Sequence, residues 1–235
     1  MKFRLWQITD GKYIFERVMN NWKDWRRHQR AELMAARECI GEADHRRWSA
    51  AITELLEQGF LALRTSTVGF CWPHRGEYDP RPLMFFFQTR GATLALPEVV
   101  NKHEPLRFRK WWQEAPMKIG AYDIPVPDNT DVVTVDALII PMIGFDKLGF
   151  RLGYGSGYFD RTLAVMKPRP LAIGVAFEIL RLENLHPHAH DIPMDFVVTE
   201  AGIYHATHTG LKSVSAGQCA DILTARTGEI RETEG

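Results

Sequence analysis

The segment GFDKLGFRLGYGSGYFD has the residue types of a phosphate-binding loop. It holds five of the chain's 18 glycines, follows an apolar run and precedes a helix-length stretch. Without side chains, backbone N–H groups can approach phosphate oxygens that a Cβ would keep at a distance. Arg151 enters the loop and Asp160 leaves it, so a cation and an oxygen ligand for Mg²⁺ bracket one small volume. This combination predicts a cradle for a magnesium-bound polyphosphate.

The spacing of the glycines does not match either of the common nucleotide signatures. Gly153-x-Gly155-x-Gly157 is not G-x-G-x-x-G, and no G-K-[ST] follows it. Glycine content alone is equally typical of a turn-rich hairpin, and an isolated Asp at the start of a helix is favoured by the helix dipole. The phosphate hypothesis therefore depends on the loop and both charges together.

A stripe of basic residues lies on a predicted N-terminal helix, residues 12–36. At 100° per residue, Lys23, Arg26, Arg30 and Arg37 fall within roughly 60° of one another. A solvated helix face would produce the same stripe, and we weigh the two interpretations equally at this point.

Strand-like and helix-like segments alternate through the middle of the chain. The runs are apolar on both sides, which is typical of a mainly parallel sheet covered by helices. We predict one α/β domain, with a loosely held polar tail after Thr207. Ligands of such sheets bind at the carboxyl ends of the strands. The expected strands are 65–72, 93–96, 132–140, 171–176 and 196–199, and the expected further helices are 43–58, 80–90 and 158–166.

Composition excludes several classes of protein. The chain has 235 residues, with 29 Lys and Arg against 29 Asp and Glu, so no general nucleic-acid-binding surface is indicated. Its apolar runs are far shorter than the roughly 20 residues of a membrane span, and the N-terminus does not read as a signal peptide. Three widely spaced cysteines suit reduced thiols in a cytoplasmic protein. The histidines of HPHAHD are expected in an exposed loop rather than in a metal site.

The ordered segments DALIIPMIGFDKLGFRLGYGSGYFDRTL, AIGVAF and HDIPMDFVVTE resemble the 5-formyltetrahydrofolate cyclo-ligase family. Upstream, RRHQRAELMAAR resembles the basic N-terminal helix of that family, and GEYDPRPLMFF resembles its short Glu-containing segment. The resemblance covers residues 26–205, which leaves an N-terminal extension, 1–25, and a polar tail, 206–235.

The resemblance implies a fold and an activity. The fold would be a three-layer sandwich of the NagB/RpiA/CoA transferase type. The activity would be the ATP- and Mg²⁺-dependent cyclisation of 5-formyltetrahydrofolate to 5,10-methenyltetrahydrofolate. The formyl oxygen would take the γ-phosphoryl group, and N10 would then displace phosphate. The protein would be a cytoplasmic monomer or weak homo-oligomer that binds neither nucleic acid nor membrane.

The resemblance also implies site residues. Arg151 and Tyr158 would be catalytic, and Asp160 and Asp191 would hold Mg²⁺. Glu77 would bind the folate, together with Tyr154, Gly155, Ser156, Gly157 and Tyr158. ATP would be bound by Arg26, Arg30, Arg151, Leu152, Gly153, Tyr154, Gly155, Ser156, Gly157, Tyr158 and Phe159.

Three departures from the family pattern keep a second hypothesis open. Ser156 stands where many members have Gly, Phe159 replaces a Tyr, and Val126 stands where Glu is usual. A paralogue that binds nucleotide and a folate-like ligand without ring closure would tolerate such changes. Unrelated small-molecule chemistry on the same architecture is a third possibility, because fold alone does not fix activity.

Overall fold

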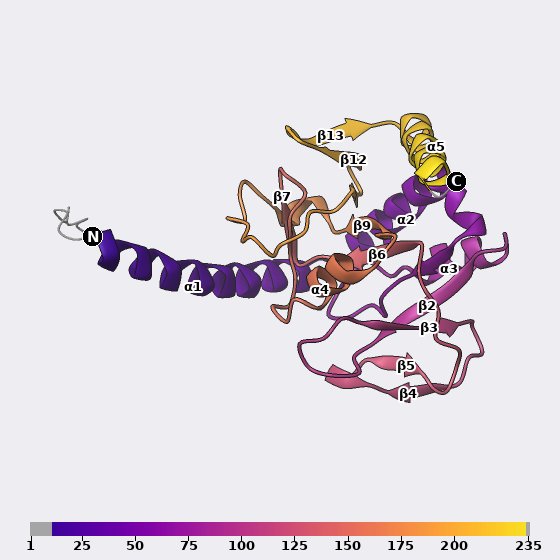
Figure 1. The fold of residues 1–235 in the computed structure, drawn as a ribbon, viewed down its shortest axis with the longest axis horizontal. Helices are drawn as coiled ribbons and strands as arrows, with labels where there is room; N and C mark the ends of the chain where they lie inside the picture. The colour runs from indigo at the N-terminus through magenta and orange to yellow at the C-terminus, as the bar shows by residue number, and fades with distance from the viewer. Residues whose placement is uncertain (1–10, 234–235) are drawn as a thin grey trace.

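A mixed eight-stranded sheet forms the centre of the molecule (Figure 1). The computed structural model describes the backbone of residues 11–233 and the side chains of residues 22–226. The strand order is β13-β12-β11-β9-β6-β1-β2-β3. These strands are β1 (Thr67–Gly69), β2 (Thr93–Glu98), β3 (Arg107–Trp111), β6 (Ala137–Pro141), β9 (Leu171–Val175), β11 (Phe196–Thr199), β12 (Gly202–Thr207) and β13 (Gly210–Val214).

The five strands from β11 to β2 pair in parallel, and the strands at both edges pair antiparallel. Every residue of β9 and β11 is buried, because helices or loops cover both faces of the sheet there. The carboxyl ends of β2, β1 and β6 therefore lie next to one another at one edge. The predicted α/β architecture, a large sheet flanked by helices, is confirmed.

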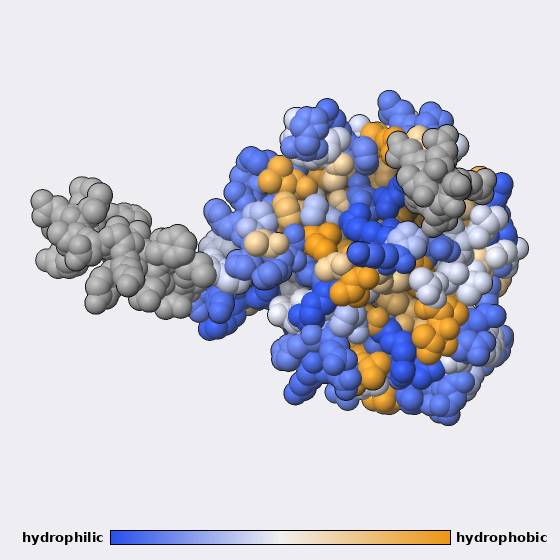
Figure 2. All heavy atoms as spheres, in the orientation of Figure 1, coloured by the Kyte–Doolittle hydropathy of each residue, from blue (hydrophilic) through white to orange (hydrophobic). Residues whose placement is uncertain are grey.

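Five α-helices lie beside the sheet in the part of the chain that the structure describes (Figure 1). They are α1 (Gly11–Glu38), α2 (Glu42–Gly59), α3 (Arg81–Gln88), α4 (Tyr158–Val165) and α5 (Ala216–Thr233). Within the described range, none of these helices combines the length and apolar character needed to cross a membrane. The N-terminal part of α1 projects away from the body, and the described surface of this helix is mostly hydrophilic on the face shown in Figure 2.

Smaller elements complete the fold beside the main sheet. The strand predicted at 132–140 begins only at β6, because the preceding segment bonds to β3 through Val133 N–H and Phe108 O. The glycine-rich segment starts as a hairpin before it becomes a loop, so the hairpin interpretation holds for its first half. These elements are β4 (Met117–Ile119), β5 (Pro125–Pro127), β7 (Gly144–Asp146), β8 (Arg151–Leu152), β10 (Arg181–Leu182), η1 (Leu61–Thr65), η2 (Ala121–Asp123) and η3 (Glu178–Leu180).

The expectation of a loosely held tail after Thr207 is wrong for residues 210–223. β13 completes the edge of the main sheet, and α5 packs against α2. Cys219 is fully buried in this contact, 3.5 Å from where a Cβ on Gly59 would lie. Only a narrow stripe of α5 is buried. The few apolar residues of such a stripe hardly change the average composition of the segment, which therefore looks polar in the sequence.

We expect Leu223→Ala in α5 to lower the free energy of unfolding by about 2–3 kcal/mol, because Leu223 is 5% exposed and its removal leaves a cavity. Chemical denaturation measures this change. Thr224→Ala on the exposed side of the same helix is the control and should stay within about 0.5 kcal/mol of the parent. Equal stability of the two variants would contradict the packing of α5.

Candidate active site

A cavity of about 500 Å³ opens at the carboxyl ends of β2, β1 and β6. Trp72 follows β1, Pro141 ends β6, and the glycine-rich loop forms the facing wall. This is the edge at which open α/β sheets bind ligands. Every site residue predicted from the sequence lines this cavity: Arg26, Arg30, Glu77, Arg151, Leu152, Gly153, Tyr154, Gly155, Ser156, Gly157, Tyr158, Phe159, Asp160 and Asp191. Their individual roles stay predictions.

The loop between β8 and α4 needs glycine for conformational reasons at two positions. Gly155 has φ +100° and Gly157 has φ +63°, a left-handed conformation that side chains rarely adopt. Gly157 is also the residue from which α4 begins. A Cβ on Gly153 would meet no atom within 4 Å, so this part of the loop faces open space. The three glycines therefore leave stretches of the loop backbone uncovered by side chains of their own.

Arg151 and Asp160 form a buried ion pair at the two ends of the loop. Arg151 Nη2 lies 2.8 Å from Asp160 Oδ2, and the arginine side chain is only 5% exposed. Ile192 closes the arrangement, because its N–H donates to Asp160 Oδ1 and its carbonyl accepts from Arg151 Nη1. Burial lowers the pKa of Arg151, and the adjacent carboxylate opposes this effect. The pair fixes the start of α4 relative to β8.

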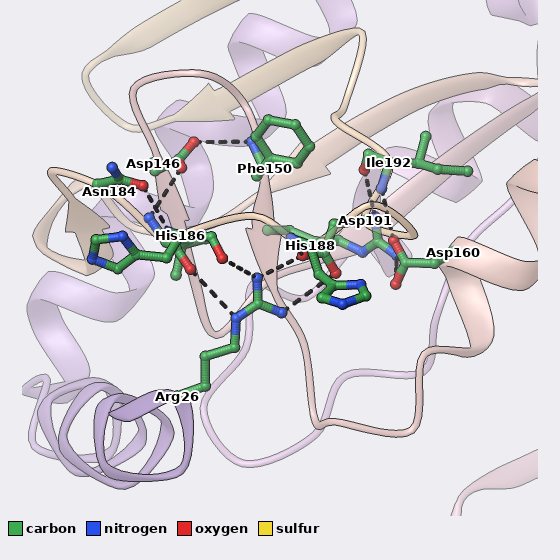
Figure 3. A network of polar contacts seen from close by, with 11 residues as sticks. Arg26, Asp146, Phe150, Asp160, Asn184, His186, His188, Asp191 and Ile192 are labelled. Atoms are coloured by element: carbon green, nitrogen blue, oxygen red, sulfur yellow. Dashed lines mark hydrogen bonds and ion pairs between the residues drawn. The ribbon is translucent and has the colours of Figure 1, made fainter. Parts of the chain in front are cut away.

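Arg26 of α1 forms an ion pair with Asp191, the second of the two predicted metal ligands (Figure 3). Its Nη2 lies 2.5 Å from Asp191 Oδ2, and it also donates to the carbonyls of Leu185 and His186. The His188 N–H donates to the same carboxylate at 2.6 Å. Burial acts to raise the pKa of Asp191, but these hydrogen bonds outweigh it, and the net pKa lies below its usual value. Asp191 is therefore a carboxylate at neutral pH.

The donor set at this edge fits a magnesium ion that is held mainly by phosphate. A carboxylate has about four lone-pair positions. Asp160 uses two of them for the contacts above, and Asp191 uses three, because Arg26 Nη1 also donates to Asp191 Oδ1 at 3.3 Å. Within the described range, no group of three or more His, Cys, Asp or Glu side chains could hold a metal ion. Mg²⁺ is usually bound by one or two carboxylates together with substrate phosphates and water. The two acids suit that mode of binding.

Glu77 also lines the cavity and belongs to a network of three side chains. It is 6% exposed, and its Oε1 accepts a hydrogen bond from the Tyr154 hydroxyl at 2.8 Å. Arg37 Nη2 donates to the same hydroxyl at 2.9 Å, and Arg37 Nη1 lies 3.6 Å from Glu77 Oε1. The His74 N–H donates to Oε2. Burial raises the pKa of Glu77 above its usual value, although Arg37 and Tyr154 oppose this shift.

The basic stripe of α1 faces the protein body and not the solvent. Arg37 is 2% exposed and Arg26 is 7% exposed, while Arg30 is half-buried and donates from Nε to Gly153 O at 2.7 Å. Only Lys23 is an exposed member of the stripe. The interpretation of the stripe as a solvated helix face is therefore wrong for three of its four residues.

Arg37 and Tyr122 contact predicted site residues through their side chains but were not themselves predicted to take part in the site. Arg37 could have been found, because it belongs to the stripe and a buried guanidinium needs a polar partner. Tyr122, in η2, lines the cavity mouth, and its hydroxyl lies 3.3 Å from that of Tyr158. No local signal marks Tyr122, since the hairpin of β4 and β5 brings it there.

The histidine-rich loop is exposed, as expected. His188 stacks on Trp22 with ring centroids 5.6 Å apart, and His186 meets the Trp25 ring edge-on at 5.2 Å. These contacts hold the loop against α1, beside the Arg26–Asp191 ion pair. These contacts give His186 and His188 a structural role.

Comparison with known proteins places this cavity in a family. The model of the 5-formyltetrahydrofolate cyclo-ligase family matches residues 22–200. A 5-formyltetrahydrofolate cyclo-ligase of Escherichia coli K12 is 32% identical over 139 residues, which cover 55% of this chain and 75% of the relative. The enzyme of that name from Haemophilus influenzae is 31% identical over 127 residues, which cover 51% of this chain and 67% of the relative.

Two solved structures are similar to most of this chain. The 5,10-methenyltetrahydrofolate synthetase of Aquifex aeolicus is 29% identical, with a TM-score of 0.68 over 81% of this chain and 96% of that one. The synthetase of Mycoplasma pneumoniae, at 19% identity, has a TM-score of 0.62 over 74% of this chain and 98% of that one, and it supports the fold alone. The family match spans most of the chain, including the loop, both acids and Glu77, and the chain belongs to the 5-formyltetrahydrofolate cyclo-ligase family.

Proposed function

We propose that this protein catalyses the ATP-dependent cyclisation of 5-formyltetrahydrofolate to 5,10-methenyltetrahydrofolate, with release of ADP and phosphate. The observation that carries the proposal is the convergence of the glycine loop, the two acids and Glu77 on one cavity in a member of this family. The helix-covered sheet also supports assignment of the fold to the NagB/RpiA/CoA transferase-like three-layer class.

The chemistry needs alignment and charge stabilisation more than a protein nucleophile. The formyl oxygen attacks the γ-phosphorus of ATP, and ADP leaves. N10 of the folate then attacks the formyl carbon, loses its proton, and the formyl oxygen departs with the phosphate. Phosphorylation converts a poor leaving group into a good one, so the protein need only align the reactants and stabilise negative charge.

Residues of the loop stabilise the negative charge of the phosphate groups. The amides from Gly153 to Gly157 surround the phosphate oxygens, and Arg151 supplies a guanidinium whose position Asp160 fixes. Arg30, held by Gly153 O, lies on the other side of the loop. A bound Mg²⁺ would be held by Asp160 and Asp191 and would neutralise charge on the β- and γ-phosphates. Tyr158 stands at the cavity mouth, where its ring limits access of water.

The part of the cavity that is lined by Glu77 suits the folate ring system. Glu77 accepts hydrogen bonds from the N–H edge of the pterin, a pairing that a carboxylate makes well. Trp72, Leu96 and Ile124 provide an apolar wall for the ring faces. Val126, where the family usually has Glu, is 5% exposed and belongs to this wall, so the change preserves a continuous apolar surface.

A direct assay tests the proposal. The purified protein is incubated with 5-formyltetrahydrofolate, ATP and Mg²⁺, and the near-ultraviolet absorbance of the methenyl product is followed. We expect product only when ATP is present, with one ADP released per ring closed. Nucleotide binding without any product would instead identify a non-catalytic paralogue.

A further inference from the structure

A second hollow, of about 530 Å³, adjoins the cavity described above. The two hollows share Arg26, Arg30, Asp191 and the loop residues 155–157. The glycine loop and the basic stripe of α1 thus form the boundary between two connected compartments. Trp22, Lys23 and Arg161 line only the second compartment.

The two compartments differ sharply in charge. Four arginines and three carboxylates line the first, so its charges nearly balance. The second has five Lys and Arg side chains and one carboxylate among its described lining residues. A compartment with such an excess of positive charge concentrates polyanions, whereas a balanced and mostly apolar one suits a heterocycle. The cations are Lys23, Arg26, Arg27, Arg30 and Arg161, and the carboxylate is Asp191.

Most of this positive charge is not neutralised by the protein. Arg26 pairs with Asp191, and Arg27 makes a solvent-exposed pair with Asp24. Over residues 22–226, no carboxylate forms an ion pair with Lys23, Arg30 or Arg161. Burial lowers the pKa of Arg30, the charges of Arg26 and, to a smaller extent, Arg27 lower it further, and Asp191 opposes this shift. Mutual repulsion of this kind would be relieved by a bound polyanion.

Arg161 is held against the glycine loop and lines the second compartment, whereas Arg151 lines the first. Its guanidinium donates to Ser156 O and lies over the Tyr158 ring, 5.3 Å from the centroid. Its Nη1 would be 3.1 Å from a Cβ on Gly157. Its Nε is buried and has no hydrogen-bond partner within the described residues. Arg161 lines the second compartment, and no carboxylate pairs with it within residues 22–226, so a guanidinium fixed in this position is suited to binding a phosphate group.

We propose that the second compartment receives the polyphosphate of the nucleotide, and that Arg161, assisted by Lys23, is a phosphate-binding residue. The proposal rests on the proposed function, which supplies the nucleotide. The folate ring then occupies the first compartment, and the γ-phosphoryl group lies at the shared boundary between Arg151 and Arg161. The two substrates reach the glycine loop from opposite sides.

Nucleotide binding by variants of the full-length protein tests this assignment. Calorimetric titrations use ATP with Mg²⁺, inorganic tripolyphosphate, and adenosine as three separate probes. We expect Arg161→Gln to raise the Kd for ATP and for tripolyphosphate roughly tenfold, and to leave adenosine binding unchanged. The salt dependence of the tripolyphosphate Kd should also become shallower, because one phosphate contact is lost.

A matched control is available on α3. Arg90 also donates to a backbone carbonyl, that of Phe86, and lies over the Phe86 ring, but it is remote from both compartments. Arg90→Gln should leave all three titrations unchanged. Arg161→Lys keeps the charge and should recover part of the tripolyphosphate affinity, which loss of loop structure alone would not allow.

The outcomes separate this proposal from the proposed function. If the wild-type protein forms the methenyl product but Arg161→Gln binds tripolyphosphate normally, the assignment of Arg161 is overturned and the cyclo-ligase activity stands. If ring closure is absent but Arg161→Gln still weakens polyphosphate binding, the assignment stands and the activity does not. A wild-type protein that binds neither ATP nor tripolyphosphate overturns both.

Discussion

Asp160→Asn is expected to lower turnover by about 100- to 1,000-fold at saturating ATP and folate. The substitution removes a negative charge that has two roles in the proposed mechanism. The charge binds Mg²⁺, and it fixes the position of Arg151, whose Nη2 lies 2.8 Å from Asp160 Oδ2. The Mg²⁺ concentration for half-maximal rate should rise, because a neutral amide is a poorer ligand for a hard cation. Initial rates measured across a Mg²⁺ titration give both values.

Asp160→Asn should also lower the stability of the protein, and this effect must be separated from the effect on catalysis. Arg151 is 5% exposed, so loss of its carboxylate partner should lower the free energy of unfolding by about 1–3 kcal/mol. Asp195→Asn is the matched control, because Asp195 also pairs with arginine, Arg169, and accepts a backbone N–H, yet lines neither compartment. The control should lose comparable stability and keep its Mg²⁺ dependence. Normal turnover of Asp160→Asn, with the fold retained, would remove this residue from the metal site.

Glu77→Gln is expected to raise the KM for 5-formyltetrahydrofolate by about 10- to 100-fold while the KM for ATP stays within about twofold. A hydrogen bond to a buried carboxylate contributes about 1.5–3 kcal/mol, and the neutral amide also presents an N–H donor where the pterin needs an acceptor. Steady-state kinetics with each substrate varied in turn measures the two constants. An effect on the ATP constant alone would place Glu77 outside the folate site.

The pH dependence of the folate KM provides a second signature of Glu77. Burial raises the pKa of this carboxyl above its usual value. As the pH falls through that raised pKa, the carboxylate is protonated, so it loses its negative charge and one of its two oxygens becomes a donor in place of an acceptor, and the wild-type KM should increase. Glu77→Gln should lack this limb of the profile.

Glu98→Gln is the control for these measurements. Glu98 is also a largely buried carboxylate paired with arginines, Arg107 and Arg109, but it does not line the cavity. The Glu98→Gln variant should keep both the wild-type KM and the wild-type pH profile.

The central strands could be predicted, and the edge strands could not, for one physical reason. The segments that became β9 and β11 are continuous apolar runs because both of their faces are covered, and that pattern is visible in sequence. β3 and β13 bury only some of their residues and owe their structure to a neighbouring strand. Half-exposed antiparallel strands carry a weak local signal, so the sequence does not predict β12, and it places β13 in a loosely held tail.

The sequence by itself determined the chemical groups of the candidate site and their local order. Two left-handed glycines, a preceding guanidinium and a following carboxylate lie within ten residues, so their proximity follows from chain connectivity. Only the tertiary structure decided how distant groups meet. Arg26 reaches Asp191 across 165 positions, and Arg37 reaches Tyr154 across 117. Such contacts depend on how α1 packs against loops that follow β8 and β10, and helical periodicity specifies a face of α1 without specifying what that face will touch.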